Sequence, residues 1–204
     1  MQNSDETSFK STKQGILPRS QIVLMETRAT KIGFQKLETI AKSNTSITIE
    51  LILFIHKLCF SEILEQDAGV FRAFQVTYSG KEAPIYTKVR ELMKVLIDDT
   101  EYAVSKLPSP KSDDYFSRFI EILAHFQHRF VYIHPFVDYN GRMSRMFTNY
   151  LLMRSNFPII EINVNRKDAR IKYIQSLQKA DEGDYSALEH MLTNAITERF
   201  AKLV

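Results

Sequence analysis

Ile133-His-Pro-Phe-Val-Asp-Tyr-Asn-Gly-Arg-Met-Ser-Arg145 is the stretch that decides how this chain is interpreted. The segment before it, from about 113 to 132, is apolar at helical spacing and predicts a helix. Pro135 interrupts that pattern, because proline cannot continue a helix interior. A further helix is predicted from near Asn140 to about Ser155. The stretch therefore predicts a loop that leads directly into a helix start.

The residues at this predicted helix start suit an anion such as phosphate. The first turn of a helix presents unpaired N–H groups and a partial positive charge. Gly141 has no Cβ and lets a ligand approach the backbone closely. Arg142 and Arg145 are three positions apart, so their guanidiniums share one helix face and could bind two phosphates.

Two further side chains add chemistry to the loop. His134 can accept a proton near neutral pH, and Asp138 is an oxygen ligand suited to Mg²⁺. Each residue alone has an ordinary structural explanation: Asn140 as a helix cap, the arginines as a solvated face. Their order around one helix start favours phosphate-ester chemistry on a nucleotide.

The stretch closely resembles the signature of Fic proteins, His-x-Phe-x-Asp/Glu-Gly-Asn-Gly/Lys-Arg-x-x-Arg. The resemblance extends over about residues 47 to 192. Ala68-Gly-Val-Phe-Arg72 resembles the Gly-x-x-Arg turn before the family's hairpin, and QVTYSGKEAPIY resembles that hairpin, called the flap. Ala180-Asp-Glu-Gly-Asp-Tyr185 resembles the family's Gly-Asp-Tyr helix junction.

The resemblance implies a protein adenylyltransferase. His134 would take the proton from a Ser, Thr or Tyr hydroxyl of a target protein, and that oxygen would attack the α-phosphate of ATP. Pyrophosphate would leave, and Asp138 would hold Mg²⁺. The flap would bind the target by strand pairing, which is a known mode of peptide recognition.

The resemblance also assigns the nucleotide contacts. Asn140 and the backbone around Gly141 would bind the α- and β-phosphates. Arg142 would reach the β-phosphate and Arg145 the γ-phosphate, while Phe136 would anchor the loop in the core.

By the same analogy, Tyr173 and Asp181 would border the nucleobase.

Tyr139 departs from the family pattern, which usually has glycine at this position. If the backbone there needs a positive φ, a tyrosine costs about 1–3 kcal/mol of strain. Its ring could also narrow the space beside the phosphates. Another nucleotide, CDP-choline as substrate, and a degenerate Fic fold that only binds are therefore the alternatives to AMP transfer.

Control of the activity is a second question. Many relatives carry an inhibitory Ser/Thr-x-x-x-Glu-Gly/Asn helix, and this chain has no good match. Ser46-Ile-Thr-Ile-Glu50 has the spacing, but a helix start explains it better. The expectation is a separate antitoxin-like inhibitor protein or no restraint.

The rest of the chain predicts a mainly α fold, with one domain and one small β-hairpin around Ser79-Gly80. Residues 1–18 are interpreted as a flexible tail, 19–46 as a helical extension with an unfavourable Gly33, and 47–204 as the Fic domain. Helices are also predicted at about 47–64, at about 86–105 and over RKDARIKYIQSLQKA. A last helix is predicted after Asp184, which is placed to cap it.

Composition excludes several other classes. The net charge of +3 is a weak argument for nucleic acid, so DNA binding by the basic cluster 166–172 is a minor alternative. Cys59 is the only cysteine, and no apolar run approaches the roughly 20 residues that span a bilayer. With no secretory signal at the amino terminus, a cytoplasmic location is expected. His125 and His128 share a helix face, but packing explains them better than a metal, as it does for His56. Homo-oligomer formation stays open.

Overall fold

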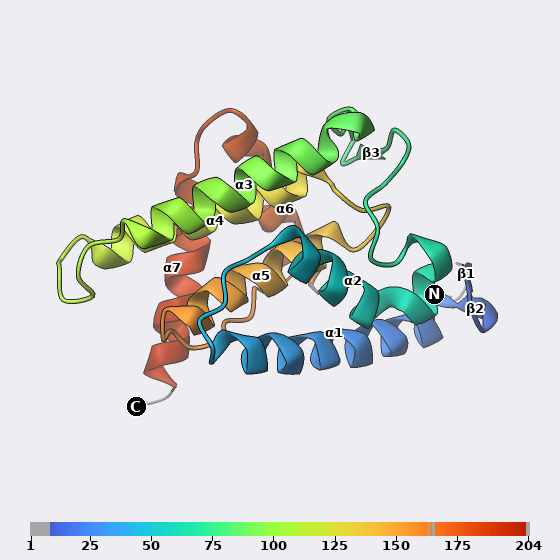
Figure 1. Cartoon of the computed structure of the whole chain (residues 1–204), viewed down its shortest axis with the longest axis horizontal. Helices are drawn as coiled ribbons and strands as arrows, with labels where there is room; N and C mark the ends of the chain where they lie inside the picture. Colours follow the sequence, from blue (N-terminus) through green and yellow to red (C-terminus); the bar gives the residue numbers. More distant parts are fainter. Residues whose placement is uncertain (1–8, 163, 165, 203–204) are drawn as a thin grey trace.

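The computed structural model describes residues 9–202 except 163 and 165. Helices dominate it, as predicted, and two small antiparallel hairpins complete it (Figure 1). The elements are β1 (Phe9–Thr12), β2 (Gly15–Pro18), α1 (Arg19–Ala41), α2 (Ile49–Leu64), η1 (Glu65–Asp67), β3 (Thr77–Tyr78), β4 (Lys81–Glu82), η2 (Tyr86–Lys88), α3 (Val89–Ser105), α4 (Tyr115–Ile133), α5 (Asn140–Arg154), α6 (Lys167–Asp181) and α7 (Ser186–Ala201).

Helix α5 lies at the centre of the molecule, between α1 and α4 (Figure 1). Its residues from Met143 to Leu152 are nearly all buried, because neighbouring helices cover it on several sides. The arginines at its first turns are partly exposed at the rim of this core. The central helix thus fixes the position of the charged motif on a rigid, well-packed element.

Helix α1 packs closely against α2 and α5 at Gly33. A Cβ at Gly33 would lie 2.4 Å from Cys59 Sγ and 2.4 Å from Met146 Cε, both of which are buried. The glycine that is unfavourable for a helix in the sequence is thus explained by the close approach of three helices. Burial also raises the pKa of Cys59 to about 12, so this thiol is unreactive.

We expect Gly33→Ala to destabilise the fold by about 1–2 kcal/mol. Overpacking a full core costs about 1–3 kcal/mol, which outweighs the gain in helix propensity of about 1 kcal/mol. Urea unfolding measures the change, with Thr27→Ala on the exposed face of the same helix as the control. A Gly33→Ala protein more stable than the original would contradict the tight packing.

The prediction of a flexible tail to Pro18 is wrong for residues 9–18, which form the hairpin β1–β2. Thr12 stabilises its turn, because its Oγ1 accepts a hydrogen bond from Gln14 N at 3.1 Å and donates one to Gly15 O at 2.9 Å. The hairpin contacts both α1 and α2. Residues 1–8 of the predicted tail lie outside the described residues.

The flap hairpin is confirmed and is short. Thr77 pairs with Glu82, and Tyr78 with Lys81. Ser79 and Gly80 both have positive φ, which is the geometry of a tight two-residue hairpin turn.

The other predicted helices are found within a few residues of their expected bounds. The N-cap position of α7 is Tyr185, and Asp184, one residue earlier, supports the helix start by accepting a hydrogen bond from Ser186 N at 3.0 Å. Thr48 caps α2 by accepting from Leu51 N, and Glu50 is exposed, so the stretch around Glu50 is a helix start. In the described part of the chain, no helix is long and apolar enough to cross a membrane.

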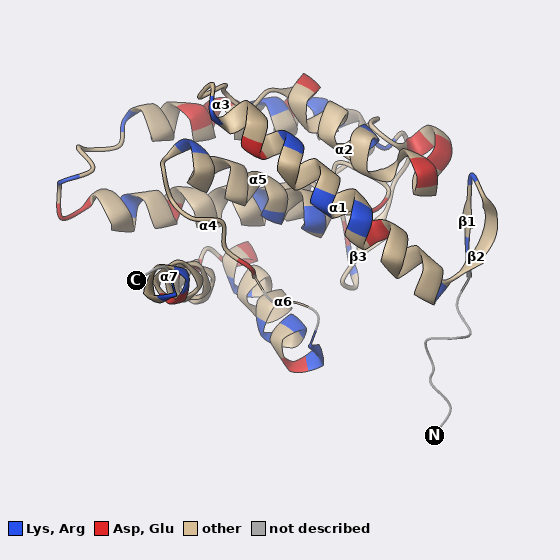
Figure 2. Cartoon of the chain, turned by 90° about the horizontal axis from the view of Figure 1, so that it is seen from below, with Lys and Arg blue, Asp and Glu red and all other residues tan. Residues whose placement is uncertain are grey.

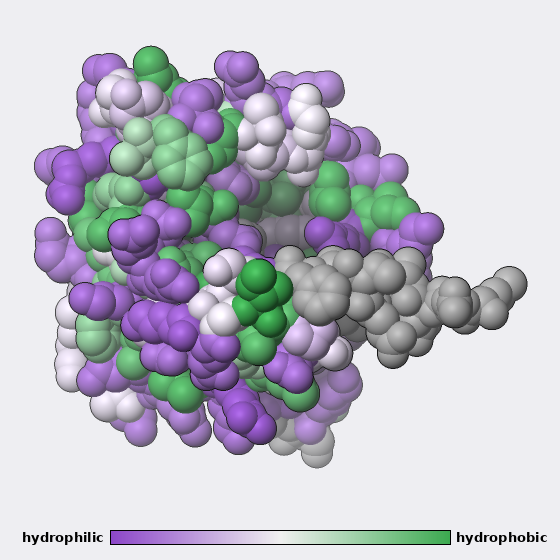
Figure 3. Space-filling view, turned by 90° about the vertical axis from the view of Figure 1, so that its right-hand side faces the viewer, coloured by the Kyte–Doolittle hydropathy of each residue, from purple (hydrophilic) through white to green (hydrophobic). Residues whose placement is uncertain are grey.

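The surface is of mixed character. Figure 2 shows Lys and Arg interspersed with Asp and Glu along the helices, rather than one basic stripe on the face in view. Figure 3 shows apolar residues scattered among polar ones on the side where the β1–β2 hairpin lies. Within the predicted basic cluster, Arg166 pairs with Asp168, and both are exposed. These surfaces give no support to the DNA-binding alternative.

Candidate active site

His134 ends helix α4 in a left-handed conformation, with φ 51° and ψ 58°. This turn lifts the imidazole out of the helix. His134 Nδ1 lies 3.2 Å from the carbonyl oxygen of Val131. A carbonyl can only accept, so Nδ1 carries the hydrogen and Nε2 keeps its lone pair. Nε2 is therefore the atom that could take a proton from a substrate.

The surroundings keep this imidazole neutral at physiological pH. Burial lowers the pKa of His134 below its ordinary value, and the Arg72 guanidinium lowers it further. The Val131 carbonyl and the Asp138 carboxylate act in the opposite direction without reversing the result. A general base must be unprotonated to act, so the environment suits that role.

The loop after His134 is held by Asn140 and Phe136. Asn140 Oδ1 accepts from Phe136 N at 2.9 Å, and Asn140 Nδ2 donates to Phe136 O at 2.8 Å. The Asn140 side chain is buried and uses both polar atoms on this loop. Phe136 is fully buried, as expected for an anchor. In this arrangement the Asn140 side chain holds the shape of the loop, and its contact with a phosphate stays a prediction.

His56 of α2 packs against the same loop. Its ring stacks on Phe136, with centroids 3.7 Å apart and planes at 5°. Its Nδ1 accepts from Gly69 N at 2.9 Å, so its Nε2 carries the hydrogen that faces the Asp138 carbonyl at 3.4 Å. The interpretation of His56 as a core histidine with satisfied hydrogen bonds is confirmed.

His56 is expected to make stability depend on pH. Burial lowers its pKa to about 4, whereas in the unfolded chain it titrates near 6.5. Between these pH values the unfolded state binds more protons, so stability falls as pH decreases from 6.5 to 4. Each pKa unit corresponds to about 1.4 kcal/mol, which gives a loss of about 3 kcal/mol across the window.

Urea unfolding at several pH values measures this loss. His56→Gln, which keeps an acceptor for Gly69, should reduce the slope, whereas His190→Gln at an exposed position should leave it unchanged. An identical slope in His56→Gln would exclude His56 as the cause.

Tyr139 adopts a positive φ of 65°, so the position does require the conformation that glycine favours. The ring is 5% exposed and stacks on Phe60, with centroids 4.0 Å apart. Its hydroxyl donates to Glu26 Oε1 at 3.0 Å. These core contacts offset the backbone strain, and the ring also lies against one of the two arginines, with the Arg142 guanidinium 5.1 Å from its centroid.

Gly141, Arg142 and Arg145 lie on the first two turns of α5. No side chain among the described residues caps this helix start. A Cβ at Gly141 would lie 3.4 Å from Arg145 Nη1, so a larger residue would crowd that guanidinium. As predicted, one end of α5 combines unpaired backbone N–H groups, a glycine at position 141 and the two arginines.

Glu26 of α1 holds one of the two arginines. Its Oε2 accepts from Arg142 Nη2 at 2.7 Å, and its Oε1 also accepts from Arg19 Nη1 at 3.0 Å. Burial raises the pKa of Glu26, but the bond and charge of Arg142, with help from Tyr139 and Arg19, outweigh burial and lower it. Glu26 is only 3% exposed, and a buried carboxylate keeps its charge only when it is paired. Arg142 and Arg19 supply that pairing.

Lys10 of the β1–β2 hairpin reaches the predicted metal ligand. Its Nζ lies 2.6 Å from Asp138 Oδ2 and 3.2 Å from the Tyr139 hydroxyl. Asp138 Oδ1 accepts from Tyr139 N at 2.6 Å. Both carboxylate oxygens of Asp138 therefore have partners within the described chain.

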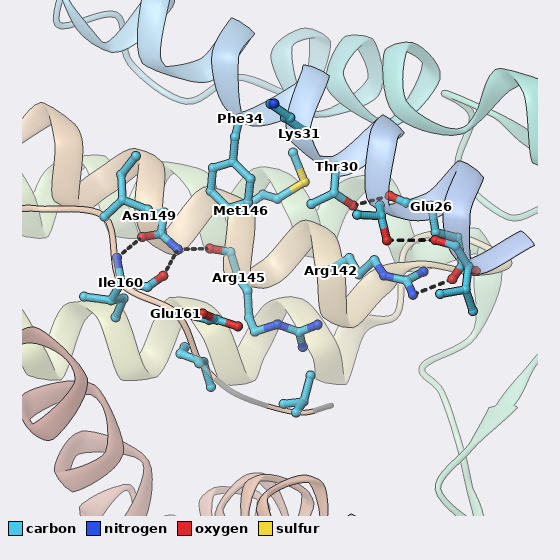
Figure 4. Close-up of a pocket in the computed structure, with 15 residues that line it drawn as sticks. Glu26, Thr30, Lys31, Phe34, Arg142, Arg145, Met146, Asn149, Ile160 and Glu161 are labelled. Atoms are coloured by element: carbon cyan, nitrogen blue, oxygen red, sulfur yellow. Dashed lines mark hydrogen bonds and ion pairs between the residues drawn. The ribbon is translucent and has the colours of Figure 1, made fainter. Parts of the chain in front are cut away.

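A cavity of about 490 Å³ opens beside the two arginines, between α1, α5 and the segment before α6 (Figure 4). Phe34, Met146 and Ile160 contribute to its apolar part. Figure 4 shows Arg142 directed toward Glu26, whereas the guanidinium of Arg145 carries no such contact. Within residues 9–202 as described, Arg145 has no ion pair and lies over the Tyr173 ring at 5.6 Å. Tyr139 does not line this described cavity, so its ring does not plug it.

Tyr173 and Asp181, the two residues predicted near the nucleobase, have different surroundings in the structure. Asp181 lines a second cavity of about 30 Å³ beneath the flap. Its carboxylate pairs with Lys81 of the flap and accepts from His128 Nε2 at 3.0 Å. Tyr173 is buried beneath Arg145 and its hydroxyl accepts from Gln127 Nε2 at 3.2 Å. Tyr173 lines neither this cavity nor the larger one beside Arg145.

His128 is a packed residue, as predicted, with Tyr185 and Asp181 as its hydrogen-bond partners. The described residues contain no cluster of three or more histidine, cysteine or acidic side chains that could hold a metal. The single carboxylate of Asp138 falls outside that definition.

The Gly-x-x-Arg turn includes Arg72, but the role of this side chain in supporting the motif loop was missed. Arg72 is 4% exposed, and its guanidinium donates to the carbonyl oxygens of His134, Phe74 and Pro84. Its backbone N donates to Pro135 O at 2.9 Å. One buried side chain thus joins the flap to the loop that carries the imidazole.

Glu26 and Lys10 were also missed. Glu26 falls on the stripe of α1 that includes Ile22, Gly33 and Leu37, all of them buried. A charged residue on a buried stripe requires a partner, which was a usable signal. Lys10 carried no comparable local signal, because its partner is 128 positions away.

Comparisons with known proteins agree with the geometry. A profile of the Fic/DOC family matches residues 46–152. The chain is 29% identical over 179 residues to protein adenylyltransferase Fic of Nematostella vectensis, covering 88% of this chain and 38% of that one. It is 36% identical over 140 residues to the protein of the same name from Drosophila willistoni, covering 68% and 25%. A solved fragment of Fic-1 from C. elegans has a TM-score of 0.70 at 26% identity, covering 85% of this chain and 48% of that one. This chain therefore spans less than half the length of these relatives.

Proposed function

Because the chain belongs to the Fic/DOC family, we propose that it transfers the AMP part of ATP onto a hydroxyl group of a target protein. The observation that supports this most directly is that a neutral His134 precedes, by a short loop, the uncapped start of α5. The names of its relatives, protein adenylyltransferase Fic, are consistent with it.

The reaction uses His134 as general base. Nε2 takes the proton of the acceptor hydroxyl while that oxygen forms a bond to the α-phosphorus. The bond between the α-phosphorus and the oxygen leading to the β-phosphate breaks, and pyrophosphate leaves. Backbone N–H groups near Gly141, with Arg142 and Arg145, stabilise the charge on the phosphates.

The residues present fit Mg²⁺ as cofactor. Mg²⁺ is commonly held by one or two carboxylates together with substrate phosphates, and Asp138 supplies one half-exposed carboxylate. When bound, the ion would neutralise phosphate charge. Lys10 must leave Asp138 Oδ2 for this ligand to become available.

We also propose that the nucleobase enters beneath the flap, near Asp181. The cavity there is about 30 Å³, close to the volume of one water molecule. Binding therefore requires the Lys81–Asp181 pair to open.

The flap is the proposed docking strand for the target protein, and an antitoxin-like protein is the proposed external inhibitor. A cytoplasmic location is consistent with the single buried thiol of Cys59.

Labelled nucleotides test the proposal. The chain is incubated with Mg²⁺, cell lysate and ATP labelled at either the α- or the γ-phosphate, and lysate without the chain is the control. Transfer of the α-label only, with a matching mass increase on a hydroxyl residue, is expected. Transfer of the γ-label would indicate a kinase, and label only from another nucleotide or CDP-choline would change the substrate.

A binding module without catalysis is the second candidate. The contacts of Lys10 with Asp138 and of Glu26 with Arg142 favour it, because two of the charges needed for chemistry are paired within the chain. Absence of transfer from every nucleotide, together with retained nucleotide binding in calorimetry, would support this candidate.

A further inference from the structure

Tyr78 of the flap covers one face of the His134 imidazole. The two ring centroids are 4.4 Å apart and the planes differ by 14°, so the rings are stacked. Tyr78 lies on β3 and comes to His134 only through the fold, because 56 positions separate them along the chain. The contact joins the element proposed to bind the target with the residue proposed to take the proton.

The stack supplies an orientation that the hydrogen bond of His134 leaves undetermined. The bond from Nδ1–H to Val131 O fixes one edge of the ring, but the ring can still tilt about that bond. A parallel aromatic ring on one face opposes such a tilt, because tilting would break the stacked contact or create a clash.

Tyr78 is itself held in place from two directions. Its hydroxyl donates to Tyr132 O at 3.3 Å, at the end of α4. Lys81, its partner in the hairpin register, has its ammonium 5.1 Å from the Tyr78 ring and pairs with Asp181 of α6. The ring is therefore fastened to α4 through its hydroxyl, and this contact does not depend on the Lys81–Asp181 pair, which opens when a nucleobase enters.

We propose that Tyr78 is a positioning residue, whose stacked ring holds the His134 imidazole so that Nε2 points at the acceptor hydroxyl. This inference rests on the proposed function, and it adds a residue that acts through His134 rather than on the substrate. Because Tyr78 is part of the flap, a target that pairs with the flap would meet a base already in its working orientation.

Two substitutions separate the ring from its hydroxyl. Tyr78→Ala removes the stack, and we expect kcat to fall roughly 10- to 100-fold, since small misplacements of a catalytic group have effects of that size. Tyr78 also lines the cavity beneath the flap where the nucleobase is proposed to enter, so the comparison uses kcat at saturating ATP rather than KM. Tyr78→Phe keeps the ring and should retain most of the rate. Tyr102→Ala, at an aromatic residue 66% exposed on α3, is the matched control.

A second measurement does not depend on activity. In a proton–carbon spectrum of the histidine side chains, the ring current of Tyr78 shifts the His134 signals upfield. Tyr78→Ala should move these signals downfield, while Tyr78→Phe should leave them near their original positions.

The outcomes are distinguishable. An unchanged kcat in Tyr78→Ala, or a loss in Tyr78→Phe as large as in Tyr78→Ala, overturns the positioning role while the proposed function stands. If the unmodified chain transfers no label from any nucleotide, the proposed function fails. In that case His134 signals that do not respond to Tyr78→Ala overturn the inference as well, whereas a downfield shift supports the stack.

Discussion

Replacing His134 by asparagine is expected to lower the rate of AMP transfer by about 100- to 10,000-fold, the usual contribution of a general base. Asparagine cannot take the proton, because its side-chain amide is not basic at neutral pH. It also tolerates the left-handed backbone at this position, where φ is 51°, and is a common residue just after a helix end. The loss should therefore come from the chemistry and not from a changed backbone.

The α-label assay measures this loss, and calorimetry with ATP checks that binding is retained. His190→Asn is the matched control, because His190 is exposed on α7 and far along the chain from the motif. A His134→Asn protein that still transfers AMP at the original rate would show that another group accepts the proton.

Replacing Arg72 by methionine is expected to destabilise the fold by about 3–5 kcal/mol. Methionine has a similar length but no donors, so the partly buried carbonyl oxygens of His134, Phe74 and Pro84 would lose their partner. Each buried polar group left without a hydrogen bond costs about 1–3 kcal/mol. Arg72→Lys should recover only part of the loss, because an ammonium cannot reproduce the planar fork of a guanidinium.

Urea unfolding gives the size of the effect, and hydrogen exchange shows where it acts. We expect faster exchange in the flap and in the loop after His134, since Arg72 joins these two segments. Arg118→Met is the control, because Arg118 forms an exposed ion pair with Asp114 and should lose less than about 1 kcal/mol. A loss for Arg72→Met as small as that for Arg118→Met would contradict the role of Arg72.

The N-terminal hairpin and helix α1 supply partners for two charged residues of the motif. The hairpin β1–β2 and helix α1 place Lys10 on Asp138 and Glu26 on Arg142, and both contacts also involve Tyr139. The tyrosine that replaces the usual glycine thus gives these two elements a common attachment point. The expectation of a separate antitoxin-like inhibitor or no restraint leaves out these internal contacts, which pair two charges of the motif within the chain.

The sequence alone determined the elements and the order of the chemistry along them. Local periodicity and Pro135 predicted α4, the loop and the start of α5 at Asn140, because helix propensity and the breaking effect of proline act over a few residues. It also identified His134, Asp138, Arg142 and Arg145 as one group, since they share a short segment.

Only the tertiary structure decided which partners these residues have. Arg72 on His134 O, Tyr78 on the imidazole and Lys10 on Asp138 join positions from 56 to 128 residues apart. The direction of the Tyr139 ring depended in the same way on space between α1 and α2. Hydrogen bonds and stacking depend on distances of a few ångströms, and those distances are set by how helices pack, which no local pattern in the sequence encodes.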